Sequence, residues 1–351
     1  LKRLARAVPG PWPPRRGGMA AVAAEQAPPF IDTVGNFVHQ DFRGFRLPNQ
    51  YSAKDPALLK RTGAAERIRV HNGRLLDPPA MLAEHGFQLV AAPTKIDLLD
   101  NDAVKKHYYK ECKAVVKAVT RCEEVRGGSH EYRNGFSGLP GGHKKAAKPT
   151  PNGSGGVYGQ GIHSDMCAAI EDDFARYVVP DGRHFQCLNL WRSTDPQTPV
   201  AMMPLMLCDM RSVSPEDIVF GDGMNTSNIK QFTKVVDQRV VFSPSQRWYY
   251  FPAMRPDEML VFRQYDSRQE ALNLRTVFHS AVVDPTSPKD CPMRSSIEVR
   301  MQAIFGKETG KEARMARFKS QISTRYPDGT ISTWFSGPIE NYRPPVPRAK
   351  L

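Results

Sequence analysis

Short apolar segments recur between residues 157 and 305, with turn residues between them. Several segments are rich in Val, Ile, Phe, Tyr and Trp, and several alternate apolar with polar positions, as half-buried strands do. The segments are VYGQGIH (157–163), RHFQCLNLWR (183–192), PLMLCDMR (204–211), DQRVVFS (237–243), RWYYFPA (247–253), MLVFRQYD (259–266), RTVFHSAVV (275–283) and SSIEVRMQAIF (295–305). This series predicts a mainly β protein with flanking helices, whose core is an antiparallel jelly roll or β-sandwich.

The first part of the chain has a different pattern. Residues 97–121 place apolar side chains on one side at helical spacing, which predicts a long amphipathic scaffold helix. FQLVAAP (87–93) predicts a short buried strand. Asp77, followed by two prolines, predicts the N-cap of a helix over the AMLAEHGF stretch. Scattered aromatic residues among Pro, Gly and Asn over 19–55 predict an arm that packs on the main domain.

These patterns suggest where the chain divides. Residues 134–156 are rich in Gly, Lys, Pro and Ser, which predicts a flexible loop or a lid over the site. Met19 is the natural start that we expect, because the residues before it contain no Met and resemble no secretory signal. The expected parts are a disordered or non-native extension (1–18), an arm with helical scaffold (19–133), the loop (134–156), the catalytic β core (157–305), and a C-terminal helix and tail (306–351).

Composition narrows the classes of protein. With 351 residues, of which 40% are hydrophobic, the chain can bury a large core. Mean hydropathy is −0.48 and no apolar run approaches the roughly 20 residues of a membrane-spanning helix, so we expect no membrane partner. The net charge of +13 comes largely from the two ends of the chain, so nucleic acid is not the expected partner. The six cysteines form no CxxC pair, which favours a reducing, cytoplasmic location.

The candidate chemistry begins with His163-Ser164-Asp165. Residues i and i+2 of an extended segment point to the same side, so His163 and Asp165 can bind one cation. His279, in a later β segment, can complete the two-histidine, one-carboxylate triad of non-haem Fe(II) oxygenases, which leaves positions open for cosubstrate and O₂. The HxD pattern alone is weak evidence, because His39 and Asp41 form a second copy in the arm. We interpret that copy as a surface or capping pair.

A possible cosubstrate anchor follows the triad. Arg294 and Ser296 open the last strong β segment, and Arg300 shares their strand face. An arginine fork can bind a carboxylate through two hydrogen bonds, and a hydroxyl can add a third. Oxygenases that use 2-oxoglutarate need this arrangement for the distal carboxylate of the cosubstrate. The alternative is that the two arginines form salt bridges with Glu298 or Asp290.

Five blocks of the sequence resemble one family of hydroxylases and desaturases of fungal and bacterial secondary metabolism. That family includes gibberellin-desaturase-like proteins and relatives of the cephalosporin 7α-methoxylase component. The blocks are NLWRS (189–193), PLMLCDMRSV (204–213), RWYYFPAMRPDEMLVFRQYDS (247–267), HSAVVDP (279–285) and RSSIEVR (294–300). The resemblance covers about 157–305.

The resemblance implies a double-stranded β-helix core, of the jelly-roll or cupin-like kind. It implies an Fe(II)/2-oxoglutarate-dependent dioxygenase in which His163, Asp165 and His279 bind iron. Arg294, helped by Ser296 or Arg300, then binds 2-oxoglutarate. With O₂, such an enzyme hydroxylates, desaturates or cyclises a small-molecule substrate through a ferryl species.

Four further residues are candidates for lining the substrate pocket. Asn189 and Trp191 share one face of a strand, and the sequence does not say whether that face is the inner one. Tyr250 and Gln264 complete the set, although core packing of the aromatic residues and a turn or ligand-orienting role of Gln264 are at least as reasonable. No pattern indicates the oligomeric state.

Two other functions are compatible with the sequence. The first is a metal-dependent β-barrel enzyme that does not use 2-oxoglutarate, which would keep the triad without needing Arg294. The second is a non-catalytic binding module that uses its basic tail, which predicts association with nucleic acid that weakens steeply with salt.

Overall fold

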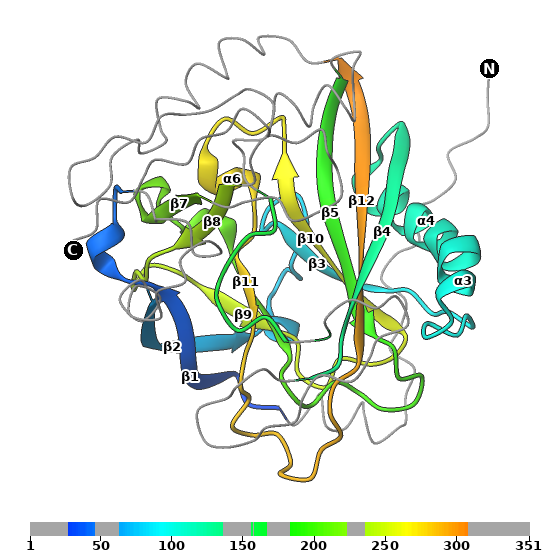
Figure 1. Ribbon diagram of the computed structural model, residues 1–351, viewed down its shortest axis with the longest axis horizontal. Coiled ribbons are helices and arrows are strands. Elements are labelled where there is room, and N and C mark those ends of the chain that lie inside the picture. The colour runs from blue at the N-terminus through cyan, green and yellow to red at the C-terminus, as the bar shows by residue number, and fades with distance from the viewer. Residues whose placement is uncertain are drawn as a thin grey trace.

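The computed structural model describes residues 27–45, 63–135, 156, 158–166, 183–222 and 236–307. The strands form two five-stranded sheets and one two-stranded sheet (Figure 1). Sheet A has the order β1 (Phe30–Val38), β2 (Gly63–Asn72), β9 (Trp248–Tyr250), β6 (Leu205–Cys208) and β11 (His279–Ala281). Sheet B has the order β3 (Phe87–Ala91), β10 (Glu258–Asp266), β5 (Arg183–Ser193), β12 (Ser296–Lys307) and β4 (Glu124–Arg133). The hairpin consists of β7 (Ile218–Asp222) and β8 (Val236–Val240).

One face of sheet B is apolar and covered by a helix. A capped helix begins with α3 (Asn101–Ala103), continues through a π-helical turn (Val104–Tyr108) and ends with α4 (Tyr109–Thr120), as the apolar spacing over 97–121 predicted. Figure 1 shows α3 and α4 beside β4, on the side of sheet B that faces away from sheet A. The packed residues include Val104, Tyr108, Cys112 and Val116 of the helix and Leu188, Leu190, Met259, Val261, Ile297, Val299 and Met301 of the sheet.

The other face of sheet B looks toward sheet A. Because side chains alternate along a strand, Asn189 and Trp191 of β5 lie on this inner face when Leu188 and Leu190 lie on the outer one. The register pairs Asn189 with Arg300 and Trp191 with Glu298 of β12, so these two charged side chains share the inner face. The structure thereby settles which face of β5 points inward.

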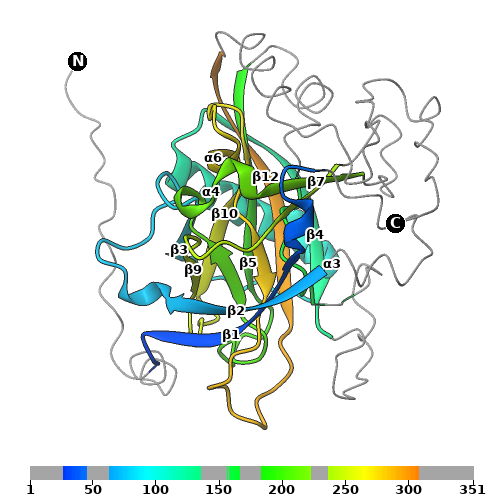
Figure 2. The ribbon, with the colours of Figure 1, turned by 90° about the vertical axis from the view of Figure 1, so that its left-hand side faces the viewer.

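Sheet A carries the segment 158–164 between its two edge strands. Gly161 forms a parallel bridge with Asn36 of β1, and His163 forms an antiparallel bridge with His279 of β11. Ser164 bridges to Gln238 of β8 in the hairpin. Figure 2 shows β1 and β2 running across the molecule at a steep angle to β5 and β12. The HSD motif is therefore fixed by backbone hydrogen bonds on more than one side.

Several expectations about the first part of the chain were wrong. No strand was predicted before residue 87, yet β1 and β2 are regular strands of sheet A. The AMLAEHGF stretch forms a single turn rather than a helix: the N–H of His85 donates to the carbonyl of Met81 at 2.8 Å, and Gly86, with φ +85°, ends the turn before β3. Strand β4 was not predicted, and its two glycines, Gly127 (φ +81°) and Gly128 (φ +144°), hide the strand pattern at a bulge.

Some predicted parts lie outside the described residues. They are 1–18, most of the 134–156 loop, and the tail beyond 307. The two ends of the loop are described and lie together, because the N–H of Asn134 donates to the carbonyl of Gly156 at 2.8 Å. Within the described ranges, no helix has the length and apolar character needed to cross a membrane.

Candidate metal centre

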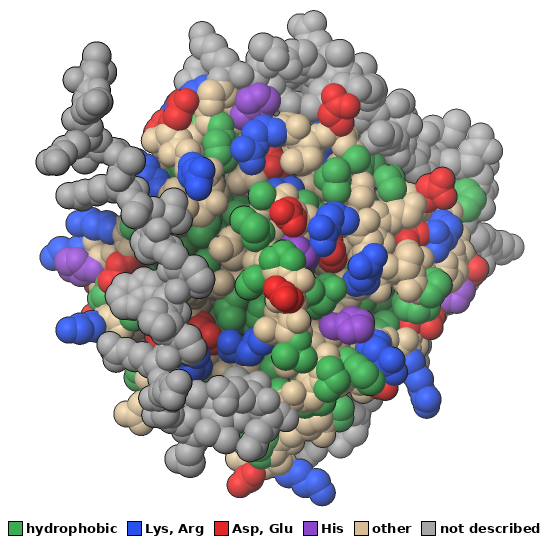
Figure 3. Space-filling model, turned by 180° about the vertical axis from the view of Figure 1, so that it is seen from behind, with side chains coloured by type: hydrophobic (Ala, Val, Ile, Leu, Met, Phe, Trp, Pro, Cys, Tyr) green, Lys and Arg blue, Asp and Glu red, His purple; other side chains and the backbone are tan. Residues whose placement is uncertain are grey.

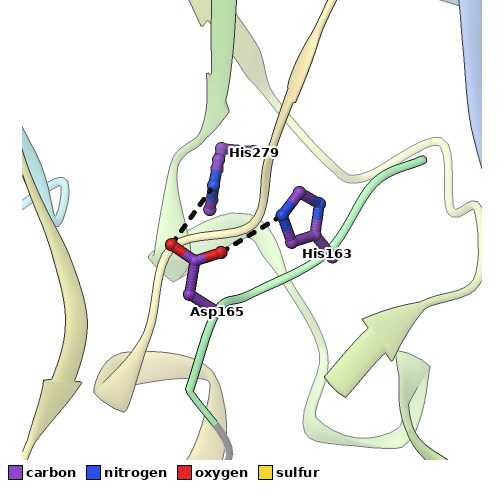
Figure 4. A group of neighbouring side chains, drawn as sticks. All are labelled: His163, Asp165 and His279. Carbon is purple, nitrogen blue, oxygen red and sulfur yellow. Dashed lines mark ion pairs between the residues drawn. The ribbon is translucent and has the colours of Figure 1, made fainter. Parts of the chain in front are cut away.

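Three potential ligands converge between the sheets. Nε2 of His163 lies 3.3 Å from Oδ1 of Asp165, and Nε2 of His279 lies 4.0 Å from Oδ2 of the same carboxylate. One ligand atom from each residue lies within 4.8 Å of the other two. Figure 4 shows both imidazole rings beside the Asp165 carboxylate. The structure therefore brings together the three residues that the sequence singled out.

The second nitrogen of each imidazole faces a backbone carbonyl. Nδ1 of His163 lies 2.7 Å from the carbonyl oxygen of Gly161, and Nδ1 of His279 lies 3.3 Å from that of Val277. An Nδ1–H that donates to a carbonyl leaves Nε2 as an unprotonated acceptor, which is the form that binds a metal. Two such imidazoles and one carboxylate are the donor set of a non-haem iron centre, so these residues fit Fe(II).

Burial and nearby charges favour the metal-binding protonation states of Asp165 and His279. Burial would raise the pKa of Asp165, but Arg300 and the two histidines outweigh burial and hold this pKa well below its usual range. Burial, helped by the neighbouring His163, lowers the pKa of His279 to about 4. Burial also acts to lower the pKa of His163, yet the hydrogen bond and charge of Asp165 outweigh it and raise that pKa. At neutral pH the site offers a carboxylate and a neutral His279.

Two side-chain amides contact Asp165. Nδ2 of Asn189 donates to Oδ2 of Asp165 at 2.6 Å, and Oε1 of Gln264 accepts from the backbone N–H of Asp165 at 2.7 Å. The pairing of β10 with β5 shifts register between Arg263 and Tyr265, so Gln264 is the extra residue of a β-bulge. Bulges commonly redirect side chains beside active sites. Asn189 and Gln264 therefore hold the metal-binding segment.

A hydroxyl pair connects the two halves of the centre. The hydroxyl of Ser164 contacts the Thr276 hydroxyl, and Thr276 lies three residues before His279. The ring of Phe262 packs against His279 with 4.9 Å between centroids, which keeps an apolar wall beside the ligand. Sequence analysis missed Thr276 and Phe262. No local signal could have found them, because both act only through a tertiary contact.

Arg294 is a buried cation with no acidic partner among the described residues. Within the described residues no carboxylate lies within ion-pair distance of Arg294, whose guanidinium donates to the carbonyl of Met203. The guanidinium lies 4.3 Å from the ring centre of Tyr158 and 5.3 Å from that of Trp191. Its Nε is buried without a hydrogen-bond partner. Burial lowers the pKa of Arg294 to about 10, so the side chain stays charged and can accept a carboxylate ligand.

Arg294, just before β12, and Arg300, within β12, differ in their partners. Arg300 forms an ion pair with Glu298 at 3.0 Å and lies 3.5 Å from Oδ2 of Asp165. The alternative that the arginines form salt bridges with neighbouring acids is therefore correct for Arg300 and Glu298. Arg294 makes no such pair. Ser296 is buried and donates to the carbonyl of Arg133 at 3.3 Å. Arg300 therefore interacts with Asp165, a candidate metal ligand, whereas Arg294 is available to bind an anion.

The candidate pocket residues lie in different places. Trp191 is on the inner face beside Arg294, while Asn189 and Gln264 contact Asp165.

In sheet A, Tyr249 pairs with Leu207 and Leu207 pairs with His279, so Tyr249 shares the face of His279. Tyr250 therefore points to the opposite face, where it is fully buried in the apolar cluster around β1 and β2. The structure does not bring Tyr250 to the metal ligands.

The second HxD copy is a capping pair on the surface, as expected. His39 caps a short 3₁₀ turn (Gln40–Phe42), and its Nδ1 accepts from the backbone N–H of Asp41 at 3.3 Å. Both side chains are exposed, by 44% and 78%. The same two residue types at the same spacing therefore form a metal-ligand pair only where a third ligand meets them.

Fold and site together define a double-stranded β-helix protein with a two-histidine, one-carboxylate centre. A family model described as "Oxidoreductase/YMDC permease-like domain" matches residues 40–304, and the chain belongs to that family. The match covers the metal centre and both sheets except β1 and the last residues of β12.

Individual relatives carry more specific names. A protein of Aspergillus novofumigatus named Fe(II)/2-oxoglutarate-dependent dioxygenase nvfI is 28% identical over 258 residues, which cover 68% of this chain and 83% of the relative. The hydroxylase/desaturase efuI of Hormonema carpetanum is 29% identical over 251 residues, which cover 66% and 80%. These names confirm the resemblance to secondary-metabolism hydroxylases and desaturases.

A solved structure confirms the fold. The structure titled "iron and alpha-ketoglutarate-dependent endoperoxidase NvfI" superposes with a TM-score of 0.63 at 24% identity, covering 80% of this chain and 99% of that one. The predicted mainly β, double-stranded β-helix architecture is therefore correct.

Proposed function

We propose that this protein is an Fe(II)/2-oxoglutarate-dependent oxygenase that acts on a small molecule of secondary metabolism. The observation that carries the proposal is the combination, between two facing sheets, of the triad His163, Asp165 and His279 with the buried, unpaired cation Arg294. The triad fits iron and Arg294 fits the distal carboxylate of the cosubstrate. The names of the relatives support the same activity.

The residues divide the work of the site. His163, Asp165 and His279 hold Fe(II) on one side and leave the other positions open for cosubstrate and O₂. Bound Fe(II) would supply the chemistry of O₂ activation: O₂ is the oxidant, and the decarboxylation of 2-oxoglutarate to succinate and CO₂ provides two of the electrons, so that an unactivated C–H bond can be attacked. Arg294 fixes the orientation of the cosubstrate, since its guanidinium is itself held between two aromatic rings.

The names of the relatives indicate a set of reaction types rather than one product. Their names include a dioxygenase, a hydroxylase/desaturase and an endoperoxidase. Hydroxylation, desaturation or cyclisation of a small-molecule substrate is therefore the reaction that we propose here. Trp191 borders the site from the inner face of β5 and is the candidate pocket residue that the geometry favours over Tyr250.

The two other functions receive less support. A metal enzyme that does not use 2-oxoglutarate gives no reason for the buried charge of Arg294, whose Nε has no hydrogen-bond partner among the described residues. A buried charge without a partner destabilises the fold, so it needs such a reason. A nucleic-acid-binding module needs a concentrated basic surface. On the face that Figure 3 shows, Lys and Arg side chains are interspersed with Asp and Glu side chains.

The location and domain division remain predictions. Cys112, Cys122, Cys187, Cys208 and Cys291 are free thiols, and four of them are buried, which supports the reducing, cytoplasmic location. We keep 157–305 as the catalytic core. Strands β3 and β4 nevertheless form both edges of sheet B, so the preceding part of the chain helps to build the barrel.

Calorimetric titration of 2-oxoglutarate into the Mn(II)-loaded protein tests the proposal. Arg294→Met should weaken binding by about 30-fold or more, because truncating one partner of a buried charge pair costs about 2 to 5 kcal/mol. Arg192→Met is the matched control: Arg192 of β5 is also a buried arginine but donates to the carbonyls of Ala92 and Pro256 on the outer face. Unchanged affinity in Arg294→Met, or an equal loss in both variants, would contradict the assignment.

A further inference from the structure

We propose that Asn189, assisted by Arg300, is a positioning residue that restricts Asp165 to one metal-binding oxygen. This inference rests on the proposed function. It concerns how many coordination positions the protein itself occupies, and hence whether cosubstrate and O₂ can bind the same ion. The evidence is the unequal surroundings of the two carboxylate oxygens of Asp165.

Oδ2 is engaged by the protein on two sides. Nδ2 of Asn189 donates to Oδ2 at 2.6 Å, and Nη2 of Arg300 lies 3.5 Å away. Oδ1 faces Nε2 of His163 at 3.3 Å, and Nε2 of His279 lies 4.0 Å from Oδ2 without a hydrogen bond to it. Asn189 is 2% exposed, so its amide has no competing solvent. Oδ1 is therefore the oxygen left for a cation that the two imidazoles share.

The two donors are set in place by the sheet. Asn189 of β5 and Arg300 of β12 are direct register partners on the inner face of sheet B. Glu298, two residues earlier on the same face, accepts from Nε and Nη2 of Arg300 at 3.1 and 3.0 Å. This contact orients the guanidinium toward Asp165. The strands that hold both donors lie in the middle of the sheet, which makes their placement rigid.

The hydrogen bonds have a direct consequence for coordination. A carboxylate that binds through both oxygens takes two positions on the ion and leaves fewer than the 2-oxo acid and O₂ require together. An oxygen that already accepts a 2.6 Å amide hydrogen bond loses that bond if it moves to the metal. Asn189 thus stabilises the arrangement in which 2-oxoglutarate can chelate. Second-sphere partners of ligands commonly have effects of this kind.

Cobalt(II) in place of iron gives a test that does not depend on turnover. The visible absorption of Co(II) reports its coordination, and 2-oxoglutarate can be titrated against it in air. Asn189→Leu keeps the approximate volume and removes the donor. Gln186→Met is the matched control, because Gln186 lies on the same strand, is also 2% exposed, and donates to the Asp266 carboxylate at the same 2.6 Å distance, away from the metal.

We expect Asn189→Leu to change the Co(II) spectrum before cosubstrate is added and to raise the dissociation constant of 2-oxoglutarate by about 10- to 100-fold. Affinity for Co(II) itself should fall much less. Gln186→Met should lose stability while both readouts stay as in the wild type. If Asn189→Leu fails to fold, Arg300→Gln should shift the same two readouts in the same direction by a smaller amount.

An unchanged spectrum and affinity in Asn189→Leu would overturn the inference, and so would an equal shift in Gln186→Met. Wild-type protein that binds Co(II) but no 2-oxoglutarate would instead contradict the proposed function. The wild-type arm and the variant arm therefore separate the two claims.

Discussion

The two faces of sheet B use the same strands for opposite purposes. On the outer face, Leu188 and Leu190 of β5 pack with Val299 of β12 beneath the helix that ends with α4. On the inner face, Asn189 between them is polar, Glu298 and Arg300 of β12 are charged, and apolar residues such as Trp191 lie beside them. A shift of one residue in register would exchange the two sets. Scaffold and chemistry are therefore encoded in alternate positions of one sequence.

The difference shows how a costly site is tolerated. The outer face removes large apolar side chains from water, at about 25 cal/mol per Å² of buried apolar surface. The inner face leaves buried polar atoms such as Nε of Arg294 and Nε2 of Gln264 without partners. Such atoms destabilise the protein until a ligand or water meets them. Stabilisation by one face offsets the cost of the other.

The largest effect that we expect is on the inner face. Asp165→Ala removes the one carboxylate of the triad, so metal affinity should fall by more than the ~10- to 100-fold typical of losing an outer-shell partner, and turnover should vanish. Equilibrium dialysis with Fe(II) or Co(II) measures the loss. The variant should remain folded, because it also removes a buried charge. Retained metal binding would show that the triad is not the metal site.

Leu190→Ala is the corresponding change on the outer face. Leu190 is fully buried against the helix, so its truncation should lower the free energy of unfolding by about 2 to 5 kcal/mol. Urea denaturation followed by circular dichroism measures the change. Metal and cosubstrate affinity of the folded fraction should match the wild type. If Leu190→Ala lost metal binding but kept the stability of the wild type, the two faces would not have the separate roles described here.

A paired charge cluster at the end of the outer face allows a test by pH. Burial would raise the pKa of Asp266, but Arg268, Arg263 and Gln186 outweigh it and lower that pKa. Because the folded pKa lies below the unfolded value of about 3.9, the ionised carboxylate stabilises the fold above pH 4. That stabilisation is lost as the pH falls through the folded pKa.

Asp266→Asn should therefore cost about 1 to 3 kcal/mol near neutral pH and progressively less between pH 4 and the acid limit. Urea denaturation of both proteins from pH 7 down to pH 3 gives the difference at each pH. A difference that does not change with pH would mean that the carboxylate acts through packing rather than through its charge.

The smallest effect concerns the second HxD copy. His39→Ala removes one exposed cap, so the free energy of unfolding should change by less than about 1 kcal/mol and metal binding should not change. His163→Ala, the same substitution in the other copy, should lose metal binding. Equal metal affinity of the two variants would contradict the assignment of His163.

The sequence predicted the strands whose side chains meet an apolar core. β5, β10 and β12 were recognised because they are long and rich in β-branched and aromatic residues. β2 was missed because its GAAERIRVHN sequence carries five charged or polar side chains, and it is a strand only because β1 and β9 pair with it. β4 was missed because two glycines interrupt its pattern.

The ligands could be predicted, but their surroundings could not. His163, Asp165 and His279 stand out because few residue types bind iron and their order along the β segments is informative. Asn189 was singled out only as a candidate for the pocket. Its contact with Asp165 depends on a strand that lies beside the motif in space and 24 residues away in sequence. The choice between Arg294 and Arg300 likewise required knowing which one meets Glu298.

The central claim is that this triad binds Fe(II) together with 2-oxoglutarate. Anaerobic titration of both into the purified protein, followed by visible absorption, tests it most directly. We expect a weak metal-to-ligand charge-transfer band that appears only when both are present and is absent from His279→Ala. Absence of the band from well-folded wild-type protein, or its persistence in His279→Ala, would contradict the account.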